Sequence, residues 1–533
     1  MSKQAAARKL TEVKQKSQSD SSNEDIQKKI QNRRSRELVI GLCGAVGSGV
    51  KALKDNLIHS LESSGYDIEH IRISNIIADK TDHTIKGCIG YDRYIKLQDN
   101  GDLLREKHRT SILAACAIEE IALARTILCE GDIEEEQQSG AEATVVKTTK
   151  KIAYIIDQLK HPAEVKLLRS VYPRNFYLLG LIRTEKERRL NLEEEKISSS
   201  DIDSLIRRDR KGVDYGQQVE KTIFGADYFI HNVHNQDQLL EKSVDRFIKL
   251  VHGVNGITPT LDEIGMHAAH SASLRSACLS RQVGAAISDQ QGNIITTGCN
   301  DVPSYDGGLY NSNSPTDFRC VHRGQCSNDK HKSLLKEEIR EILSKDITNE
   351  NLLNELTDKV TSETKIKSLI EYSRAVHAEM DAIVALARSY NQSAIGKTLF
   401  ATTYPSHNCA RHIVAAGIHR VVYIEPYEKS LALKLHDDAM SDLGENNKVL
   451  LTPFEGVSPR RFEAFFKSNG NRKDDGGKVI KIRVHDSYHA DSEFIDNYPE
   501  MEAKVAESVS KAFTQAPQTP QAPQTPQAPQ EPQ

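Results

Sequence analysis

The sequence predicts an α/β protein made of two successive units, each built around its own sheet. Short apolar runs of strand type alternate with longer helical segments from residue 37 to about residue 250, the pattern of a parallel sheet covered by helices. A second α/β pattern begins near Pro259. A chain of 533 residues has room for two or three domains of ordinary size.

Composition narrows the class of protein. Hydrophobic residues make up 38% and charged residues 27%, enough apolar material for real cores. The formal net charge of -4 gives no global basic field that would draw the chain to nucleic acid or a membrane. The nine cysteines have no regular spacing, so we expect reduced thiols and some metal ligands. Without a signal-type run or an 18-residue apolar stretch, we expect a soluble, cytoplasmic protein with no membrane partner.

The first unit is expected to span residues 37–250, after an arm at 1–36 that has too few large apolar groups to order itself. Its strands are predicted at 37–43, 152–157, 176–182 and 225–232, and residues 132–151 have the composition of a surface insertion.

A glycine-rich loop, Gly44-Ala45-Val46-Gly47-Ser48-Gly49-Val50-Lys51, follows the first strand and precedes a helical run at 52–63. Backbone N–H groups in that context wrap an anion at a helix N-terminus, as in a P-loop. The P-loop pattern has Lys and then Ser or Thr directly after the glycine at position 49. In this sequence Val50 intervenes, and Ala52, which follows Lys51, has no hydroxyl for magnesium. We therefore expect phosphate cradling without efficient phosphoryl transfer. The predicted nucleotide-binding residues are Gly44, Gly47, Ser48, Gly49, Val50 and Lys51, the candidate ligand is a nucleoside triphosphate, and Asp157 has the position of a Walker-B-type carboxylate.

The rest of the first unit resembles small nucleotide kinases. The resemblance is carried by Arg183, Arg188 and Arg189 after the third strand and by the late strand 225–232. It leaves open a degenerate scaffold, a nucleotide-sensing regulatory domain and an active kinase, of which we favour the regulatory domain.

The second unit is expected to span 258–486. It should contain a helix at 261–279, a hairpin of strands 283–288 and 294–299, an inserted helical pair within 327–372, a helix from Val376, a strand at 398–402, a helix from Ser406, a strand at 420–424, a helix from Lys429 and a strand at 449–452. The Pro/Gln-rich tail at 513–533 has proline at every third position from 517 and should form an extended polyproline II spacer.

The strongest chemical signal is His377-Ala378-Glu379 with Pro405-Ser406-His407-Asn408-Cys409 downstream. It resembles the His-x-Glu and Pro-Cys-x-x-Cys signature of zinc deaminases. Hydrolytic deamination needs a strong nucleophile at neutral pH, and zinc with three protein ligands leaves a position for water and lowers its pKa to around 7. The glutamate must stay off the metal to move protons, which makes Glu379 the catalytic candidate.

The surrounding sequence resembles the deoxycytidylate deaminases over roughly residues 260–455. The matching segments are 280–287, 292–303, Thr403-Tyr404-Pro405 and 415–418. The resemblance implies a cytidine-deaminase-like α/β/α sandwich with a mixed sheet. It also implies that Asn300 holds the sugar 3′-hydroxyl and that Ala378, Tyr404 and Pro405 frame the pyrimidine. Candidates for the phosphate are Arg281, Tyr427 and Lys429.

Ser406 departs from the family pattern, because the family's first metal-ligating cysteine falls at this position. A serine hydroxyl is a much poorer zinc ligand than a thiolate. Zinc could be held weakly by His377, Cys409 and Ser406 or water, or His407 could supply the third ligand. We favour the third alternative, a dead-site form. His412 is expected to be structural.

A second zinc site is predicted at Cys320, His322 and Cys326, whose spacing suits a metal loop. Free thiols in a loop are the alternative. Some deoxycytidylate deaminases carry an extra structural zinc.

The two-unit order resembles the bacterial anti-phage deaminases. That resemblance implies conversion of dCMP or dCTP to dUMP or dUTP during infection, an inhibitory partner such as a small RNA, and a homo-oligomer. A nucleotide-sensing protein without turnover is the alternative that Ser406 motivates. Polynucleotide editing is a third, which the near-neutral charge disfavours.

Overall fold

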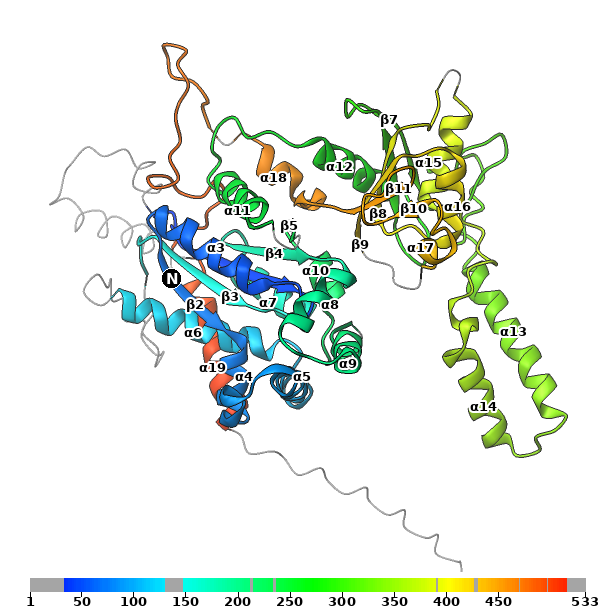
Figure 1. Cartoon of the computed structure of the whole chain (residues 1–533), viewed down its shortest axis with the longest axis horizontal. Helices are drawn as coiled ribbons and strands as arrows, with labels where there is room; N and C mark the ends of the chain where they lie inside the picture. The colour runs from blue at the N-terminus through cyan, green and yellow to red at the C-terminus, as the bar shows by residue number, and fades with distance from the viewer. Residues whose placement is uncertain are drawn as a thin grey trace, which may run out of the picture.

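The computed structural model describes residues 33–129, 147–210, 214–232, 236–389, 392–425, 430–468, 470–495 and 497–514. Two six-stranded sheets, each with helices packed on it, organise this part of the chain (Figure 1). The predicted mixed α/β class is confirmed. Among the described residues, no helix has the length and apolar character needed to cross a bilayer.

The first sheet has the strand order β12-β5-β4-β1-β3-β2. Its parallel strands are β1 Leu38–Gly44, β2 Asp67–Arg72, β3 Ile152–Asp157, β4 Phe176–Ile182 and β5 Tyr228–His231. The strands predicted at 37–43, 152–157 and 176–182 are confirmed. The sequence did not indicate β2, because this edge strand has mostly polar, partly exposed side chains.

Both faces of the first sheet are buried, which explains the continuous apolar run of β1. Leu38, Ile40 and Leu42 pack with α3 Val50–Ser63 and α11 Asp237–Val251, whereas Val39 and Cys43 pack with α6 Ile112–Leu128 and α7 Pro162–Val171. The other helices of this unit are α4 Ile73–Lys80, α5 Gly90–Lys107, α8 Glu185–Glu194, α9 Ser199–Arg210 and α10 Val219–Phe224.

The second sheet has the order β10-β11-β9-β8-β6-β7. Its strands are β6 Gly284–Ser288, β7 Ile294–Cys299, β8 Thr398–Thr403, β9 Arg420–Glu425, β10 Met440–Ser441 and β11 Val449–Pro453. β6 is antiparallel to both β7 and β8, and the remaining pairs are parallel, so the sheet is mixed as expected.

Successive side chains along these strands point to opposite faces of the second sheet, and different helices cover the two faces. Ala286, Phe400 and Val422 pack against α12 Leu261–Ser273. Their neighbours Ala285, Leu399 and Val421 pack against α15 Ala378–Ala387 and α16 His407–Ala415. Helix α12 ends at Ser273 rather than at the predicted Leu279. The chain turns there, because Ser276 Oγ and Ala277 N bond the Asn300 carbonyl and the Asp301 carboxylate instead of continuing the helix.

The insertion forms the predicted helical pair, α13 Ser327–Ser344 and α14 Glu350–Glu363, which extends away from the second sheet (Figure 1). The predicted start of the next helix, Lys429, lies outside the described residues. The described helix there is only the short α17 Ala432–Leu435.

After β11 the chain returns to the first sheet, which the predicted boundary at 486 did not anticipate. Strand β12, Gly456–Val457, pairs antiparallel with β5. Two helices follow, the short α18 Phe462–Phe466 and the longer α19 Pro499–Thr514. Helix α19 packs on α6 (Figure 1). The tail beyond residue 514 lies outside the described residues.

The predicted mobile arm is wrong for its last residues. Ser35 is fully buried and its N–H donates to the Glu493 carbonyl at 2.7 Å, while Arg34 Nε donates to Ser492 Oγ at 2.8 Å. Local composition could not show this, because the partners lie more than 450 residues further along the chain.

A buried charge cluster fixes α19. The Arg125 guanidinium of α6 bonds Glu37 Oε1 at 2.8 Å and Glu502 Oε1 of α19 at 2.8 Å, and Tyr154 donates its hydroxyl to Glu37 at 2.7 Å. Arg125 is the cation that both carboxylates share, so removing it would leave two buried carboxylates without a charge partner.

Replacing Gly298 by alanine is expected to destabilise the second unit. A Cβ at this position of β7 would lie 2.3 Å from the Ala378 carbonyl oxygen and 2.4 Å from the Ala382 nitrogen, so α15 must move. Such overpacking costs about 3 kcal/mol of unfolding free energy. Thermal denaturation of Gly298→Ala beside Gly87→Ala, whose Cβ would meet no described atom within 4 Å, checks this. Equal melting temperatures would contradict the close packing of α15.

Acidification is expected to destabilise the fold through His489, which packs under Tyr177. Burial, and then the nearby His252 and Arg34, lower the pKa of His489 to about 3, whereas an unfolded histidine titrates near 6.5. Between those values only the unfolded chain binds the proton, so the free energy of unfolding falls as the pH falls, by about 2 kcal/mol from pH 7 to 5.

Urea denaturation at pH 7 and pH 5 measures this effect. His489→Leu should lose less stability on acidification than the matched control His485→Leu, whose parent side chain is exposed. An identical loss in both variants would remove His489 as the cause.

Candidate active site

The N-terminus of α15 presents the first two predicted site residues. His377 is the N-cap residue with extended backbone, and Glu379 lies in the first turn, 4% exposed. The buried Asp381 of the same turn accepts a hydrogen bond from Cys299 N at 3.1 Å, which ties the helix start to the end of β7. This contact, which the sequence did not signal, sets the direction in which His377 and Glu379 point.

The N-terminus of α16 presents Ser406 and Cys409, the other two residues predicted to hold the metal. Tyr404 and Pro405 connect β8 to this helix, and Ser406 is its N-cap residue. Ser406 Oγ accepts a hydrogen bond from Cys409 N at 3.2 Å, the ordinary capping interaction of a serine. Ser406 therefore has a structural role here whether or not it contacts a metal.

These side chains meet where the two helices begin. His377 Nδ1 lies 3.2 Å from Cys409 Sγ and 3.1 Å from Ser406 Oγ. In the described part of the chain, His377, Glu379 and Cys409 are the group of metal-type side chains whose ligand atoms all lie within 4.8 Å of one another. His407 is outside this group, so it does not replace the missing cysteine.

The donor set fits a zinc ion. Zn–N and Zn–S bonds of about 2.0 and 2.3 Å at a tetrahedral angle place the two ligand atoms roughly 3.5 Å apart. The observed 3.2 Å between His377 Nδ1 and Cys409 Sγ is close to this separation. The imidazole and the sulfur are strong donors, whereas the Ser406 hydroxyl is a weak third one.

Burial dominates the electrostatics of the site. It raises the pKa of the Glu379 carboxyl above its usual range, and nearby His377 opposes that shift. Burial, and then the neighbouring Glu379, raise the pKa of the Cys409 thiol well above its usual value. A divalent cation at this point would favour the thiolate, because its charge outweighs the cost of desolvation.

A cavity of about 210 Å³, here called the site cavity, opens beside these groups. One wall is Tyr404, whose ring packs edge-on against Tyr423 with centroids 4.8 Å apart. The insertion contributes Asn328, at the start of α13, and Ile370. The full lining comprises Cys278, Ser280, Arg281, Val283, Asn300, Asn328, Ile370, Ser373, Ala375, Val376, His377, Ala378, Glu379, Thr403, Tyr404 and Ser406.

The predicted substrate-binding residues lie in different settings. Asn300 lines the site cavity, but its amide also bonds backbone, accepting from Val283 N at 2.7 Å and donating to the Arg281 carbonyl at 2.8 Å. Arg281 lines the cavity while its guanidinium pairs with Glu425. The Pro405 carbonyl accepts from Ser430 Oγ at 2.7 Å. Tyr427 and Lys429 lie outside the described residues.

The predicted second metal set does not converge. Cys320, His322 and Cys326 form no cluster of metal-type ligand atoms in the described structure. His322 instead pairs with Asp317, with Nε2 to Oδ2 at 3.1 Å, while Cys320 and Cys326 line a small cavity together with Cys278. Spacing along the loop could not reveal the competing aspartate contact.

The glycine-rich loop lies between β1 and α3, as its pattern predicted, and lines a larger cavity. Gly49 is the N-cap residue of α3 with a φ of 82°, a conformation that glycine adopts without strain. Asp157, at the end of β3, lines the same cavity, and the Lys51 side chain is exposed at its edge.

Comparison with known proteins identifies the family that the second unit matches. Residues 259–425 match the family model described as the cytidine and deoxycytidylate deaminase zinc-binding region. The deoxycytidylate deaminase of Enterobacteria phage T4 is 31% identical over 162 residues, which is 30% of this chain and 76% of that protein. The corresponding T2 phage enzyme is 30% identical, with 30% of this chain and 78% of that protein covered.

A solved structure was also found to resemble part of this chain. The dCMP deaminase of cyanophage S-TIM5 in complex with dCMP and dUMP is 20% identical, covering 37% of this chain and all of that one, with a TM-score of 0.23. The assignment rests on the sequence matches, which include His377, Glu379 and Cys409 within the matched range. By identity and coverage, this chain belongs to the deoxycytidylate deaminase family.

Proposed function

We propose that this chain hydrolyses the C4 amino group of a deoxycytidine nucleotide, converting dCMP or dCTP to the uracil form. The observation that carries the proposal is the 3.2 Å approach of His377 Nδ1 to Cys409 Sγ beside the buried carboxyl group of Glu379. The phage relatives are named deoxycytidylate deaminases, which supports this substrate class.

His377 and Cys409 would hold zinc, with Ser406 as a weak third ligand. Zinc bound there would supply water with a pKa near neutral. Glu379, buried within reach of these ligands, takes a proton from the attacking water and delivers protons to the ring nitrogen and then to the departing ammonia. Water and the amino compound thus give a C4 carbonyl and ammonia, so atoms and protons balance.

The remaining residues of the site cavity orient the nucleotide. The Tyr404 ring offers a flat wall for the pyrimidine beside the Ala378 backbone, and Asn300 lies at the end of the hairpin, where the sugar would meet it. Arg281 is the candidate for the phosphate, and binding there requires its guanidinium to exchange Glu425 for the ligand.

A second candidate function is nucleotide sensing without turnover. Ser406 favours it, because this hydroxyl already caps α16 and replaces an expected thiolate. In that case the cavity binds a deoxycytidine nucleotide while the chemistry is slow or absent.

We also infer that the first unit regulates the second and that the whole chain serves in defence against phage. The glycine-rich loop and the direct pairing of β12 with β5 support regulation. The defence role, an inhibitory small RNA and a homo-oligomer are supported by the resemblance of the two-unit layout to bacterial anti-phage deaminases.

Glu379→Gln is expected to lower the rate of deamination by at least about 100-fold, because it removes the proton carrier but keeps the volume of the side chain. Zinc content, measured by atomic absorption, should stay unchanged, since the carboxylate is not a ligand. The exposed Glu363→Gln on α14 is the control. The assay uses whichever of the native chain and Ser406→Cys turns over dCMP or dCTP. Undiminished uracil product in Glu379→Gln would refute the assigned role.

Ser406→Cys is expected to bring bound zinc towards one per chain and to raise turnover at least about tenfold, because a thiolate replaces a neutral hydroxyl. Metal analysis and product assays with dCMP and dCTP measure both quantities. Ser393→Cys, at an exposed position outside the site cavity, controls for an added thiol. Equal, substantial turnover by the native chain and by Ser406→Cys would exclude the sensing alternative.

A further inference from the structure

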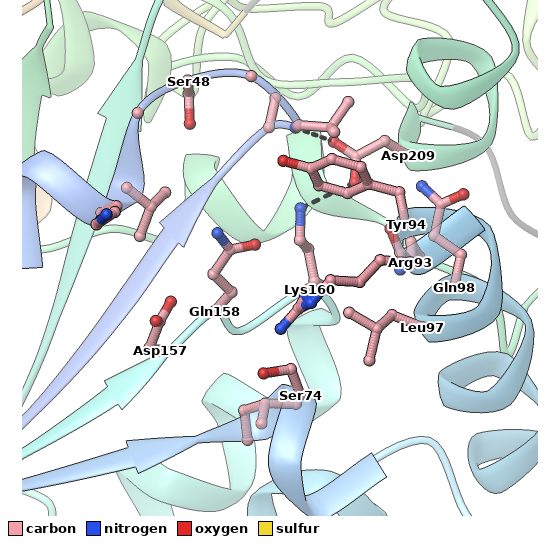
Figure 2. A pocket seen from close by; sticks show the side chains of 18 of the residues that line it. Ser48, Ser74, Arg93, Tyr94, Leu97, Gln98, Asp157, Gln158, Lys160 and Asp209 are labelled. Carbon is pink, nitrogen blue, oxygen red and sulfur yellow. Dashed lines mark hydrogen bonds and ion pairs between the residues drawn. The ribbon is translucent and has the colours of Figure 1, made fainter. Parts of the chain in front are cut away.

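A second cavity, of about 450 Å³, lies beside the glycine-rich loop and is here called the loop cavity (Figure 2). Its size is within the range of small-molecule sites. The loop forms one end, and α4 and α5 form the other. The segment after β3 and Asp209 of α9 lie between them (Figure 2).

The loop end is built for an anion. Helix α3 starts here without a side-chain cap and without an acidic residue in its first turn. Its first N–H groups therefore offer donors and a partial positive charge. Ser48 Oγ lies beside them, 1% exposed as a residue, and has no hydrogen-bond partner among the described residues.

An internal carboxylate already occupies an anion position on this loop. Asp209 Oδ2 accepts a hydrogen bond from Val46 N at 2.7 Å, and Asp209 Oδ1 accepts one from Lys160 Nζ at 2.9 Å (Figure 2). The aspartate is 1% exposed, and Lys160 also donates to the Gly44 carbonyl at 3.0 Å. A backbone N–H and a lysine converging on one carboxylate are the donors that also bind a phosphate oxygen.

The opposite end has the character of a nucleobase site. Gln98 of α5 is 5% exposed, and its Oε1 accepts no hydrogen bond from the described part of the chain. Gln217 is 7% exposed, and its Oε1 is likewise without a donor there. Tyr94, Leu97 and Ile77 add aromatic and apolar side chains to the lining of the same cavity. A buried amide oxygen without a donor is costly, so a ligand amino group or ring N–H that bonds it is favoured.

The loop lacks the hydroxyl with which a P-loop binds magnesium. Ala52 has no hydroxyl, and the Asp157 carboxylate lies beside the His70 ring, with Oδ2 to Nε2 at 3.4 Å. Charge on a bound phosphate would be balanced by Lys160 and the start of α3 rather than by a metal ion.

We propose that the loop cavity binds a nucleotide without magnesium, and that the ligand phosphate displaces the Asp209 carboxylate from Val46 N and Lys160. The base amino group bonds Gln98. The inference deepens the regulatory role proposed above for the first unit, and it rests on that proposal only for its purpose. Displacement frees α9 from the loop. Helix α8 contacts the same loop separately, where Arg188 Nε donates to the Val46 carbonyl at 2.8 Å.

Isothermal titration of the full chain with ATP in EDTA tests binding, with dCTP as a second probe. We expect saturable binding that added magnesium does not strengthen. Asp209→Asn should bind about tenfold more tightly because the competing charge is gone, and Lys160→Met about tenfold more weakly. Asp203→Asn, exposed on the same helix, is the matched control and should bind like the native chain.

Two further arms identify the cavity. Gln98→Leu should weaken ATP binding but leave inorganic tripolyphosphate unaffected, because only the base end changes. Tyr404→Ala, in the site cavity, should leave ATP binding unaffected, so the result is independent of whether the chain deaminates.

The proposal is overturned by binding that requires magnesium, by Asp209→Asn binding no more tightly than Asp203→Asn, or by loss of binding in Tyr404→Ala instead of Gln98→Leu. Tighter binding is a gain that misfolding cannot mimic. Absence of binding in both the native chain and Asp209→Asn also overturns it.

Discussion

A buried carboxylate, that of Glu263, links the two halves of this molecule. It caps α12 through Thr260 N, receives Arg246 of α11 at 3.0 and 2.8 Å, and accepts from Val457 N of β12 at 2.8 Å. A carboxylate that is 1% exposed must have such partners, because burial without them is strongly unfavourable. The same requirement fixes α19 through Arg125 and positions Lys160 on Asp209. Compensation of buried charge thus determines the layout as much as apolar packing does.

Sequence patterns predicted the parts of the fold whose signal is local. The alternation of Ala285 with Ala286 and of Leu399 with Phe400 follows from a strand with a helix on each face, and the inserted helical pair follows from its periodicity. The missed parts depend on distant partners. Strand β12 has only two residues and pairs with the edge that β5 offers. Ser35 is buried against Glu493, Tyr498 and Asn175, which are all distant in the sequence. No window of residues around these positions contains that information.

The candidate site divides in the same way. The positions of His377 and Cys409 at two helix starts follow from motif and element order, and the structure brings them together. The ion pairs that each side chain forms with its neighbours were not predictable from the sequence. Asp317 pairs with His322, and Glu425 pairs with Arg281. Asp209 and Lys160 reach the loop from more than 100 residues away, and no motif marks either of them.

The return of the chain to the first sheet has a consequence for biosynthesis. The deaminase part, residues 259–425, is inserted within a host whose last pieces, β12 and α19, are made after it. A polypeptide emerging from the ribosome would hold Arg125 with Glu37 alone until Glu502 appears. Since domains fold as units while synthesis proceeds, the guest can finish before its host. Cutting the gene between the two sheets would therefore release a folded deaminase-family fragment more readily than an intact amino-terminal one.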